Sequence, residues 1–143
     1  ELPVFFSRMR YGELYPLFNN AGRSIDEETD VLLVTGIARP APLKEEIEST
    51  GARVTLMQYA DHHDFTDGDI REIAKRYRNI GNGKKMIVTT EKDATRIAGH
   101  KEIPADIKES IHVMPIEVEF MNNGKEMFNQ IIMNYVTENS RNS

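Results

Sequence analysis

The sequence predicts an α/β domain with a mostly parallel sheet and helices on both faces, in a three-layer, Rossmann-like arrangement. The first observation is the apolar run Val31–Thr35, which ends at Gly36 and is typical of a strand buried on both faces. The second is that two further strand-like segments, Arg53–Tyr59 and Lys84–Thr90, alternate with segments of helical period. Alternating strands and helices at this spacing indicate βαβ units, whose strands run parallel.

The segment that precedes the first buried strand has a different character. Pro3–Met9 predicts a short strand, and the aromatic-rich stretch Tyr11–Phe18 is compatible with a turn and a second strand. Asn19–Asp30 is polar and predicts a loop. We therefore expect three parts, namely a β linker or hairpin with its loop, a C-terminal α/β domain and a polar tail, at residues 1–30, 31–138 and 139–143.

Helix signals follow the first two strands of the expected domain. Two prolines precede Leu43–Thr50, and Gly51 ends this segment, as expected for a helix. Thr66 is followed three residues later by Asp69, a variant of the capping-box pattern that marks a helix start. The helix that begins there is expected to run to about Asn79, with its apolar residues on one stripe.

The second half of the chain continues the alternation. Gly81–Gly83 breaks the preceding helix and reads as a turn. Glu91–Ile97 is expected to be helical and Ile111–Phe120 to be a fourth strand. Lys125–Glu138 has an apolar stripe and predicts a last, amphipathic helix, whose methionines and aromatic residues are spaced as core.

Composition excludes several classes of function. The chain has 18 basic and 23 acidic residues, a formal net charge of −5, so we expect no nucleic-acid partner. The absence of cysteine excludes disulfides, zinc thiolate sites and thiol catalysis. No run of apolar residues approaches the length of about 18 that spans a membrane. Because the chain opens on Glu1 with strand-like apolar residues, we expect it to be a piece of a longer polypeptide.

Three polar segments follow the three central strands. They are residues 36–40, 61–65 and 90–94. The carboxyl ends of parallel strands meet at one edge of a sheet, and ligands of open α/β sheets collect there. The sequence therefore predicts a ligand site at this edge.

Asp61-His62-His63 admits several interpretations. A histidine beside a carboxylate can accept a proton or orient a partner. The same residues offer nitrogen and oxygen ligands for a metal, although neighbouring residues seldom all reach one ion. The pattern Asp-His-His is also the one after which the DHH phosphoesterases, manganese-dependent enzymes, are named. These enzymes need further aspartates on earlier strands, and the strand Val31–Thr35 carries none. The simplest alternative is a solvated loop that caps the next helix.

Thr90-Glu91-Lys92-Asp93 places a hydroxyl, two acids and a base at a strand-to-helix junction. A helix N-terminus offers free N–H groups and suits an anion or a carboxylate. The simplest alternative is that Thr90 or Asp93 caps the helix. His100 and His112 have no partners at motif spacing, and we assign them no chemistry.

Taken in order, three segments resemble the tetraacyldisaccharide 4′-kinases, the lipid A 4′-kinases of Gram-negative bacteria. They are Val34–Pro40, Tyr59–Thr66 and Val88–Ala94, and the resemblance runs from about Val4 to Ile97. Each segment alone is a weak indicator of this family, but the three segments in this order are a specific one. Among members, those of Bacteroidetes are the most similar in sequence at Phe5-Phe6, Tyr11–Tyr15 and Asp64-Phe65-Thr66.

The resemblance implies a kinase that transfers the γ-phosphate of ATP to the 4′-hydroxyl of tetraacyldisaccharide 1-phosphate. Members have two α/β domains, and the N-terminal one carries the P-loop and the acids that hold Mg²⁺. The 143 residues contain neither, so they are expected to be the second domain, inactive alone. Its implied partners are that P-loop domain, the lipid disaccharide and, through the whole protein, the cytoplasmic face of the inner membrane.

The resemblance also implies roles for site residues. His62, with Asp61 ahead of it, faces the nucleotide across the interdomain cleft and supports the carboxylate that takes the proton of the attacking hydroxyl. The resemblance implies no role for His63. The residues Thr90, Glu91, Lys92 and Asp93 are a signature for nucleotide contact or domain docking. A metal-dependent phosphoesterase built on the Asp-His-His cluster and a non-catalytic α/β binding module remain as alternatives.

Overall fold

The structure is a computed structural model that describes residues 7–18, 21–120 and 133. The described chain divides into two compact units, one formed by residues 13–115 and the other by the residues up to Gly12 with those from Ile116 on. In the smaller unit, β1 (Ser7–Tyr11) pairs antiparallel with β7 (Ile116–Phe120). None of the described helices is long and apolar enough to cross a membrane.

The larger unit is built on a five-stranded sheet with the order β2-β6-β5-β3-β4. Four of the strands are parallel, and only β2 pairs antiparallel, with β6. The strands are β2 (Tyr15–Pro16), β3 (Asp30–Thr35), β4 (Arg53–Gln58), β5 (Lys85–Thr90) and β6 (Ile111–Met114). The mostly parallel sheet that the sequence predicted is therefore confirmed.

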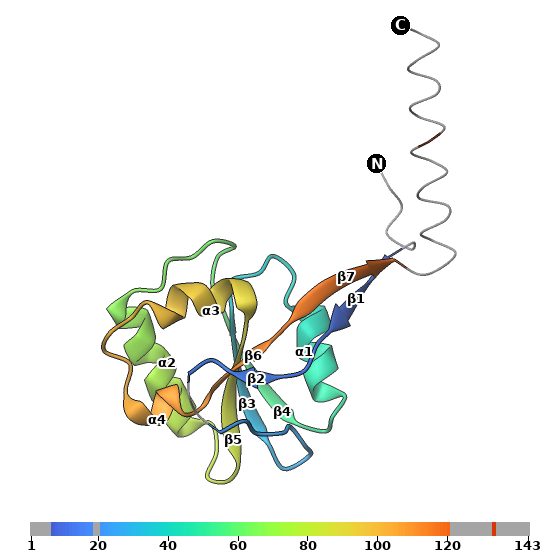
Figure 1. Cartoon of the computed structure of the whole chain (residues 1–143). Helices are drawn as coiled ribbons and strands as arrows, with labels where there is room; N and C mark the ends of the chain where they lie inside the picture. Colours follow the sequence, from blue (N-terminus) through green and yellow to red (C-terminus); the bar gives the residue numbers. More distant parts are fainter. Residues whose placement is uncertain (1–6, 19–20, 121–132, 134–143) are drawn as a thin grey trace, which may run out of the picture. The chain divides into compact units, whose positions relative to one another are not determined.

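Helices cover both faces of this sheet (Figure 1). They are α1 (Ala41–Glu48), α2 (Asp67–Asn79), α3 (Glu91–Ala98) and the single-turn α4 (Ala105–Lys108). The helix α1 lies on one face, and α2, α3 and α4 lie on the other. Right-handed crossovers require this division, because the chain moves from β3 to β4 in one direction and from β4 to β5 in the opposite one.

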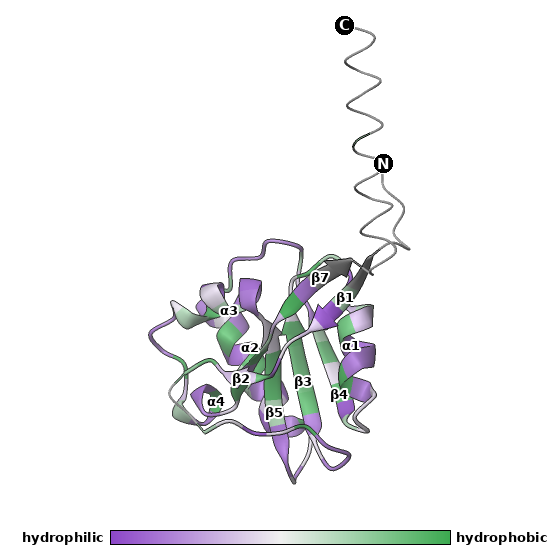
Figure 2. Ribbon diagram, turned by 45° about the vertical axis from the view of Figure 1, so that its right-hand side comes forward, coloured by the Kyte–Doolittle hydropathy of each residue, from purple (hydrophilic) through white to green (hydrophobic). Residues whose placement is uncertain are grey.

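The core lies between β3, β5 and the helices. Figure 2 shows hydrophobic residues along both central strands, and every residue of β3 after Asp30 is buried. Leu32 and Val34 belong to a cluster that includes Ile70, Ile73 and Ile97 of the helices. Burial of residues on both faces explains why β3 reads as a continuous apolar run rather than an alternating one.

The reversal of direction between β3 and β5 creates a switch point in the sheet. The connection after β3 leads outward to the edge strand β4, and the connection after β4 crosses back to β5 on the other side. The loops that follow these strands lie together at the top of Figure 1. In open α/β sheets this is where a crevice for ligands forms.

The capping box predicted for the second helix is present. The Thr66 hydroxyl accepts a hydrogen bond from the Asp69 amide at 3.1 Å, and the Asp69 carboxylate accepts one from the Thr66 amide at 2.9 Å. Each bond satisfies a backbone donor that the helix itself leaves unpaired. The helix α2 then extends to Asn79, as expected.

The expected strand Ile111–Phe120 is wrong as a single element. Its first part is β6, which pairs parallel with β5, and its second part is β7, which pairs antiparallel with β1. Pro115 separates them, since proline fixes φ and lacks the N–H that would continue a ladder. Patterning within one segment cannot reveal that its two halves have different partner strands. The sequence also missed α4, which is a single turn.

The beginning of the chain also differs from the expected division at residue 30. The first described strand is Ser7–Tyr11 rather than Pro3–Met9, of which residues 3–6 lie outside the described residues. The strand β2 belongs to the main sheet rather than to a separate linker. The expected helix Lys125–Glu138 falls, apart from Met133, outside the described residues.

His112, to which the sequence gave no chemistry, is a fully buried core residue of β6. Its Nδ1 lies 2.9 Å from the Ser110 carbonyl oxygen, and its Nε2 lies 3.2 Å from the Arg23 amide. A carbonyl only accepts and an amide only donates, so the proton is on Nδ1. Burial is the main cause that lowers the pKa of His112, so the ring stays neutral in the core.

Removing the capping hydroxyl is expected to destabilise the larger unit. Thr66→Ala leaves the Asp69 amide without its acceptor and should lower the free energy of unfolding by about 1 kcal/mol. Thr66→Ser should retain most of that stability. Urea denaturation of the chain measures both. Thr95→Ala, on the exposed face within α3, is the matched control and should leave the stability unchanged or slightly higher. Equal effects at positions 66 and 95 would contradict the capping role.

Candidate functional site at the carboxyl edge of the sheet

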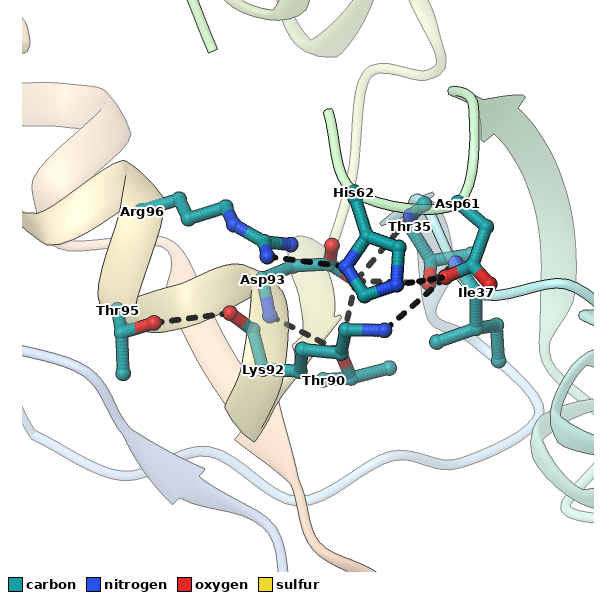
Figure 3. Close-up of polar contacts among 10 residues, drawn as sticks. Thr35, Ile37, Asp61, His62, Thr90, Lys92, Asp93, Thr95 and Arg96 are labelled. Carbon is teal, nitrogen blue, oxygen red and sulfur yellow. Dashed lines mark hydrogen bonds and ion pairs between the residues drawn. The ribbon is translucent and has the colours of Figure 1, made fainter. Parts of the chain in front are cut away.

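The three polar segments predicted at one edge of the sheet do lie there. Thr35 ends β3, and Thr90 ends β5, its parallel neighbour. The loop with Asp61 and His62 follows β4, the other neighbour of β3. Figure 3 shows residues from these segments in contact with one another.

Asp93 is the innermost residue of the site. One carboxylate oxygen, Oδ2, accepts hydrogen bonds from the Thr35 hydroxyl at 2.8 Å, the Gly36 amide at 3.2 Å and the Thr90 hydroxyl at 2.7 Å. The side chain is fully buried. These bonds tie the end of β3 to the start of α3 across the switch point. The other oxygen, Oδ1, has no hydrogen-bond partner among the described residues.

Gly36 lets the end of β3 approach the loop after β4. A Cβ at this position would lie 2.7 Å from the carbonyl oxygen of Ala60 and 3.3 Å from Oδ1 of Asp93. The first distance is shorter than any stable contact, and the neighbour is backbone that cannot turn away. Glycine is therefore required for the close packing of these two loops.

Asp61 forms an ion pair with α3. Its Oδ1 accepts a hydrogen bond from Lys92 Nζ at 3.0 Å, and both side chains are partly exposed. The hydrogen bond from Lys92 is the main cause that holds the pKa of Asp61 below its usual value of 3.8, and the charges of Lys92, His62 and Arg96 act in the same direction. Asp61 is thus ionised at neutral pH and fixed to the helix.

His62 is exposed and has an unusual backbone. Its φ is +121°, a left-handed conformation that only glycine adopts without strain, and such strain collects at functional sites. The ring lies between α3 and the preceding residue (Figure 3), with Nδ1 at 3.3 Å from Nη2 of Arg96 and Nε2 at 3.8 Å from Oδ1 of Asp61. About two thirds of the side chain faces solvent. The ring is therefore accessible to a group from another molecule or domain.

His63 turns away from its neighbour. Its Nε2 lies 2.6 Å from Oδ2 of Asp69, and its ring stacks on Tyr59 at a centroid distance of 4.8 Å and meets Phe65 edge-on at 5.3 Å. These contacts make it a packing residue at the start of α2. Asp61, His62 and His63 therefore do not converge, and the described residues contain no group of three or more potential ligands that could hold a metal ion. This geometry does not fit the phosphoesterase alternative.

The four signature residues separate into different environments. Thr90 caps α3, since its hydroxyl accepts a hydrogen bond from the Asp93 amide at 3.2 Å. Glu91 is exposed and accepts one from the Tyr15 hydroxyl at 3.2 Å. Lys92 reaches Asp61, whereas Asp93 points into the interior. The helix α3 therefore has an inner anchor and an outer polar face.

The sequence missed Arg96 as a site residue. It lies four residues after Lys92, so the two side chains project from the same face of α3. One contacts Asp61 and the other contacts His62. The spacing was a usable signal, but nothing in the sequence indicates that this face meets the loop after β4.

Fold and site together define a doubly wound α/β domain with its candidate ligand site at the switch point. Comparison with known families is more specific. A family model described as tetraacyldisaccharide-1-P 4′-kinase matches residues 2–137. The chain belongs to this family, as the three ordered motifs predicted.

Curated relatives with the name tetraacyldisaccharide 4′-kinase cover almost the whole chain. The protein from Bacteroides thetaiotaomicron is 42% identical over 98% of the chain, and that from Phocaeicola vulgatus is 40% identical over 98%. The chain spans 40% and 39% of their lengths. A crystal structure of the "apo" form of LpxK from Aquifex aeolicus in complex with ATP is 17% identical, with a TM-score of 0.47 over 90% of this chain and 35% of that one.

Loss of the buried carboxylate is expected to destabilise the larger unit. Asp93→Ala leaves two hydroxyl groups and one amide without their acceptor, which should cost roughly 3 kcal/mol or more. Glu91→Ala, which removes an exposed acid from the same helical turn, should cost much less. Urea denaturation compares the two variants. Similar losses would show that Asp93 does not connect the strands as described.

The ion pair between the loop and α3 should be visible in the titration of Asp61. Lys92→Met removes the donor and should raise the pKa of Asp61 toward 3.8. In the wild-type chain, the lowered pKa means that Asp61 stabilises the fold at neutral pH and that this contribution disappears as the pH falls through that pKa. Carboxyl NMR titration measures the change. Lys44→Met, which removes a surface ion pair with Glu48, is the control and should leave Asp61 unchanged.

Proposed function

We propose that the chain forms the second domain of a kinase that transfers the γ-phosphate of ATP to the 4′-hydroxyl of tetraacyldisaccharide 1-phosphate. Membership of the tetraacyldisaccharide-1-P 4′-kinase family supports the proposal. Relatives at about 40% identity carry that name, and the chain spans about 40% of their length. The remainder of such an enzyme would supply a P-loop domain, because these 143 residues contain no Gly-x-x-x-x-Gly-Lys-Ser/Thr pattern.

The observation that carries the proposal is the exposed Asp61–His62 pair at the carboxyl edge of the sheet. The ring of His62 is held between Asp61 and Arg96 and is open to solvent on its other side. An ordinary helix-capping loop would not need a histidine in a left-handed conformation. The arrangement suits a group that meets a substrate or a second domain from across a cleft.

Phosphoryl transfer requires a base at the attacking oxygen and charge stabilisation, rather than covalent chemistry on the protein. We infer that His62 supports a carboxylate of the P-loop domain, which takes the proton of the 4′-hydroxyl. A hydrogen bond from the ring would orient that carboxylate and adjust its basicity. Asp61, through its pair with Lys92, would hold the loop in place.

The described residues contain no group of three or more histidine, cysteine, aspartate or glutamate side chains that could hold a metal ion. Because the chain belongs to the tetraacyldisaccharide-1-P 4′-kinase family, we infer that Mg²⁺ and most of the ATP molecule bind to the P-loop domain. The exposed polar face of α3, with Glu91 and Lys92, is available for nucleotide contact or for docking of that domain. The lipid substrate implies that the whole enzyme acts at the cytoplasmic face of the inner membrane, bound peripherally.

Replacement of His62 by glycine in the full-length kinase is the sharpest test. Glycine tolerates φ of +121°, so His62→Gly removes the ring while the loop keeps its conformation. Turnover with ATP and the lipid disaccharide should fall by roughly 100-fold, and thermal stability should not fall. Initial rates and melting curves measure both.

His100→Gln is the matched control. The His100 ring contacts Asp67 and the Phe65 carbonyl oxygen rather than the site, so this variant should keep its turnover. Near-parental turnover of His62→Gly would contradict the role of His62. A full-length protein that transfers no phosphate would favour a non-catalytic binding module.

A further inference from the structure

We propose that Arg96 is a positioning residue that holds the His62 imidazole in the tautomer with its hydrogen on Nε2. The inference rests on the proposed function and adds a residue to the same site. Its basis is the contact between Nη2 of Arg96 and Nδ1 of His62 at 3.3 Å. Neither the family match nor the motifs assign a role to Arg96.

The chemistry of the two groups fixes the position of the proton. A guanidinium group remains protonated and offers only N–H donors. Nδ1 of His62 must therefore be the acceptor, with its lone pair directed at Arg96. A neutral imidazole that accepts at Nδ1 carries its hydrogen on Nε2. A hydrogen on Nδ1 would place two N–H groups against each other, so Arg96 opposes the other tautomer.

The hydrogen on Nε2 is left available for an outside acceptor. Oδ1 of Asp61 is 3.8 Å from Nε2, beyond hydrogen-bond distance, and is already bound by Lys92. Within the described part of the chain no closer acceptor faces Nε2. This is the tautomer needed to donate a hydrogen bond to the carboxylate of another domain.

Arg96 is placed for this task at an energetic cost. Its other terminal nitrogen, Nη1, is buried and has no hydrogen-bond partner among the described residues. Burial of an unsatisfied donor is unfavourable, and an arginine retained only for surface charge would turn both nitrogens into water. Asp93, three residues earlier, anchors α3 to the sheet through Thr35 and Gly36. That anchor fixes the helix, and with it the direction from which Arg96 approaches His62.

The tautomer can be measured directly. Long-range ¹H–¹⁵N spectra of the histidine-labelled chain, recorded at about pH 8.5 where free imidazole is neutral, should show His62 protonated on Nε2 alone. Arg96→Met should introduce a population protonated on Nδ1. Arg71→Met, an exposed arginine of α2, is the control and should leave the His62 signals unchanged. A wild-type ring protonated on Nδ1, or a tautomer that Arg96→Met does not alter, would overturn the proposal.

The full-length kinase tests the consequence for turnover. Arg96→Met should lower kcat by roughly tenfold with little change in KM for ATP, because fewer rings carry the correct proton. In a His62→Gly background, Arg96→Met should cause no further loss, since the two residues act through one group. Additive losses would overturn the positioning role. If His62→Gly kept full turnover while the tautomer still responded to Arg96→Met, the proposed function of His62 would fail and the assignment of the tautomer would be supported.

Discussion

The buried carboxylate of Asp93 is the constraint on which the site depends. It collects hydrogen bonds from the end of β3 and from the end of β5, two strands that are distant in sequence and adjacent in the sheet. A carboxylate in the interior is tolerated only when such donors surround it. The strand ends and α3 are therefore held in one arrangement, and the outer face of α3 acquires a fixed position.

The helix α3 serves two purposes because successive residues of a helix face different directions. Asp93 and its neighbours Ala94 and Ile97 point inward, whereas Lys92 and Arg96 lie one turn apart on the outer face. The outer pair contacts consecutive residues of the loop after β4. Because Asp93 fixes α3 to the sheet, Lys92 and Arg96 on its outer face hold the loop with Asp61 and His62 in a defined position.

In that loop, two adjacent histidines have different roles: His63 packs against its neighbours, and His62 faces solvent at the proposed site. The left-handed backbone at His62 turns its ring toward α3, whereas His63 packs against Tyr59, which follows β4, and contacts Asp69 in the first turn of α2. Packing of His63 therefore fixes one side of the loop against Tyr59 and α2, and Lys92 of α3 fixes the other side through Asp61. A strained residue persists when its surroundings hold it from both sides, and here aromatic packing and an ion pair perform that role.

The sequence by itself determined the central strands, the helix that begins after Thr66 and the edge at which the polar segments meet. Apolar runs, capping at Thr66 and glycine breaks act over a few residues, so the sequence shows them without knowledge of distant contacts. The apolar run at residues 31–35 and the alternation of strands and helices together predicted a parallel sheet. Only the tertiary structure decided what depends on contacts between distant segments: the division of Ile111–Phe120 between two sheets at Pro115, the divergence of the two histidines, and the approach of Arg96 to His62. Which nitrogen of an imidazole carries the hydrogen depends on the group that faces the ring. For His62 that group is Arg96, 34 residues further along the chain, so local sequence patterns do not reveal it.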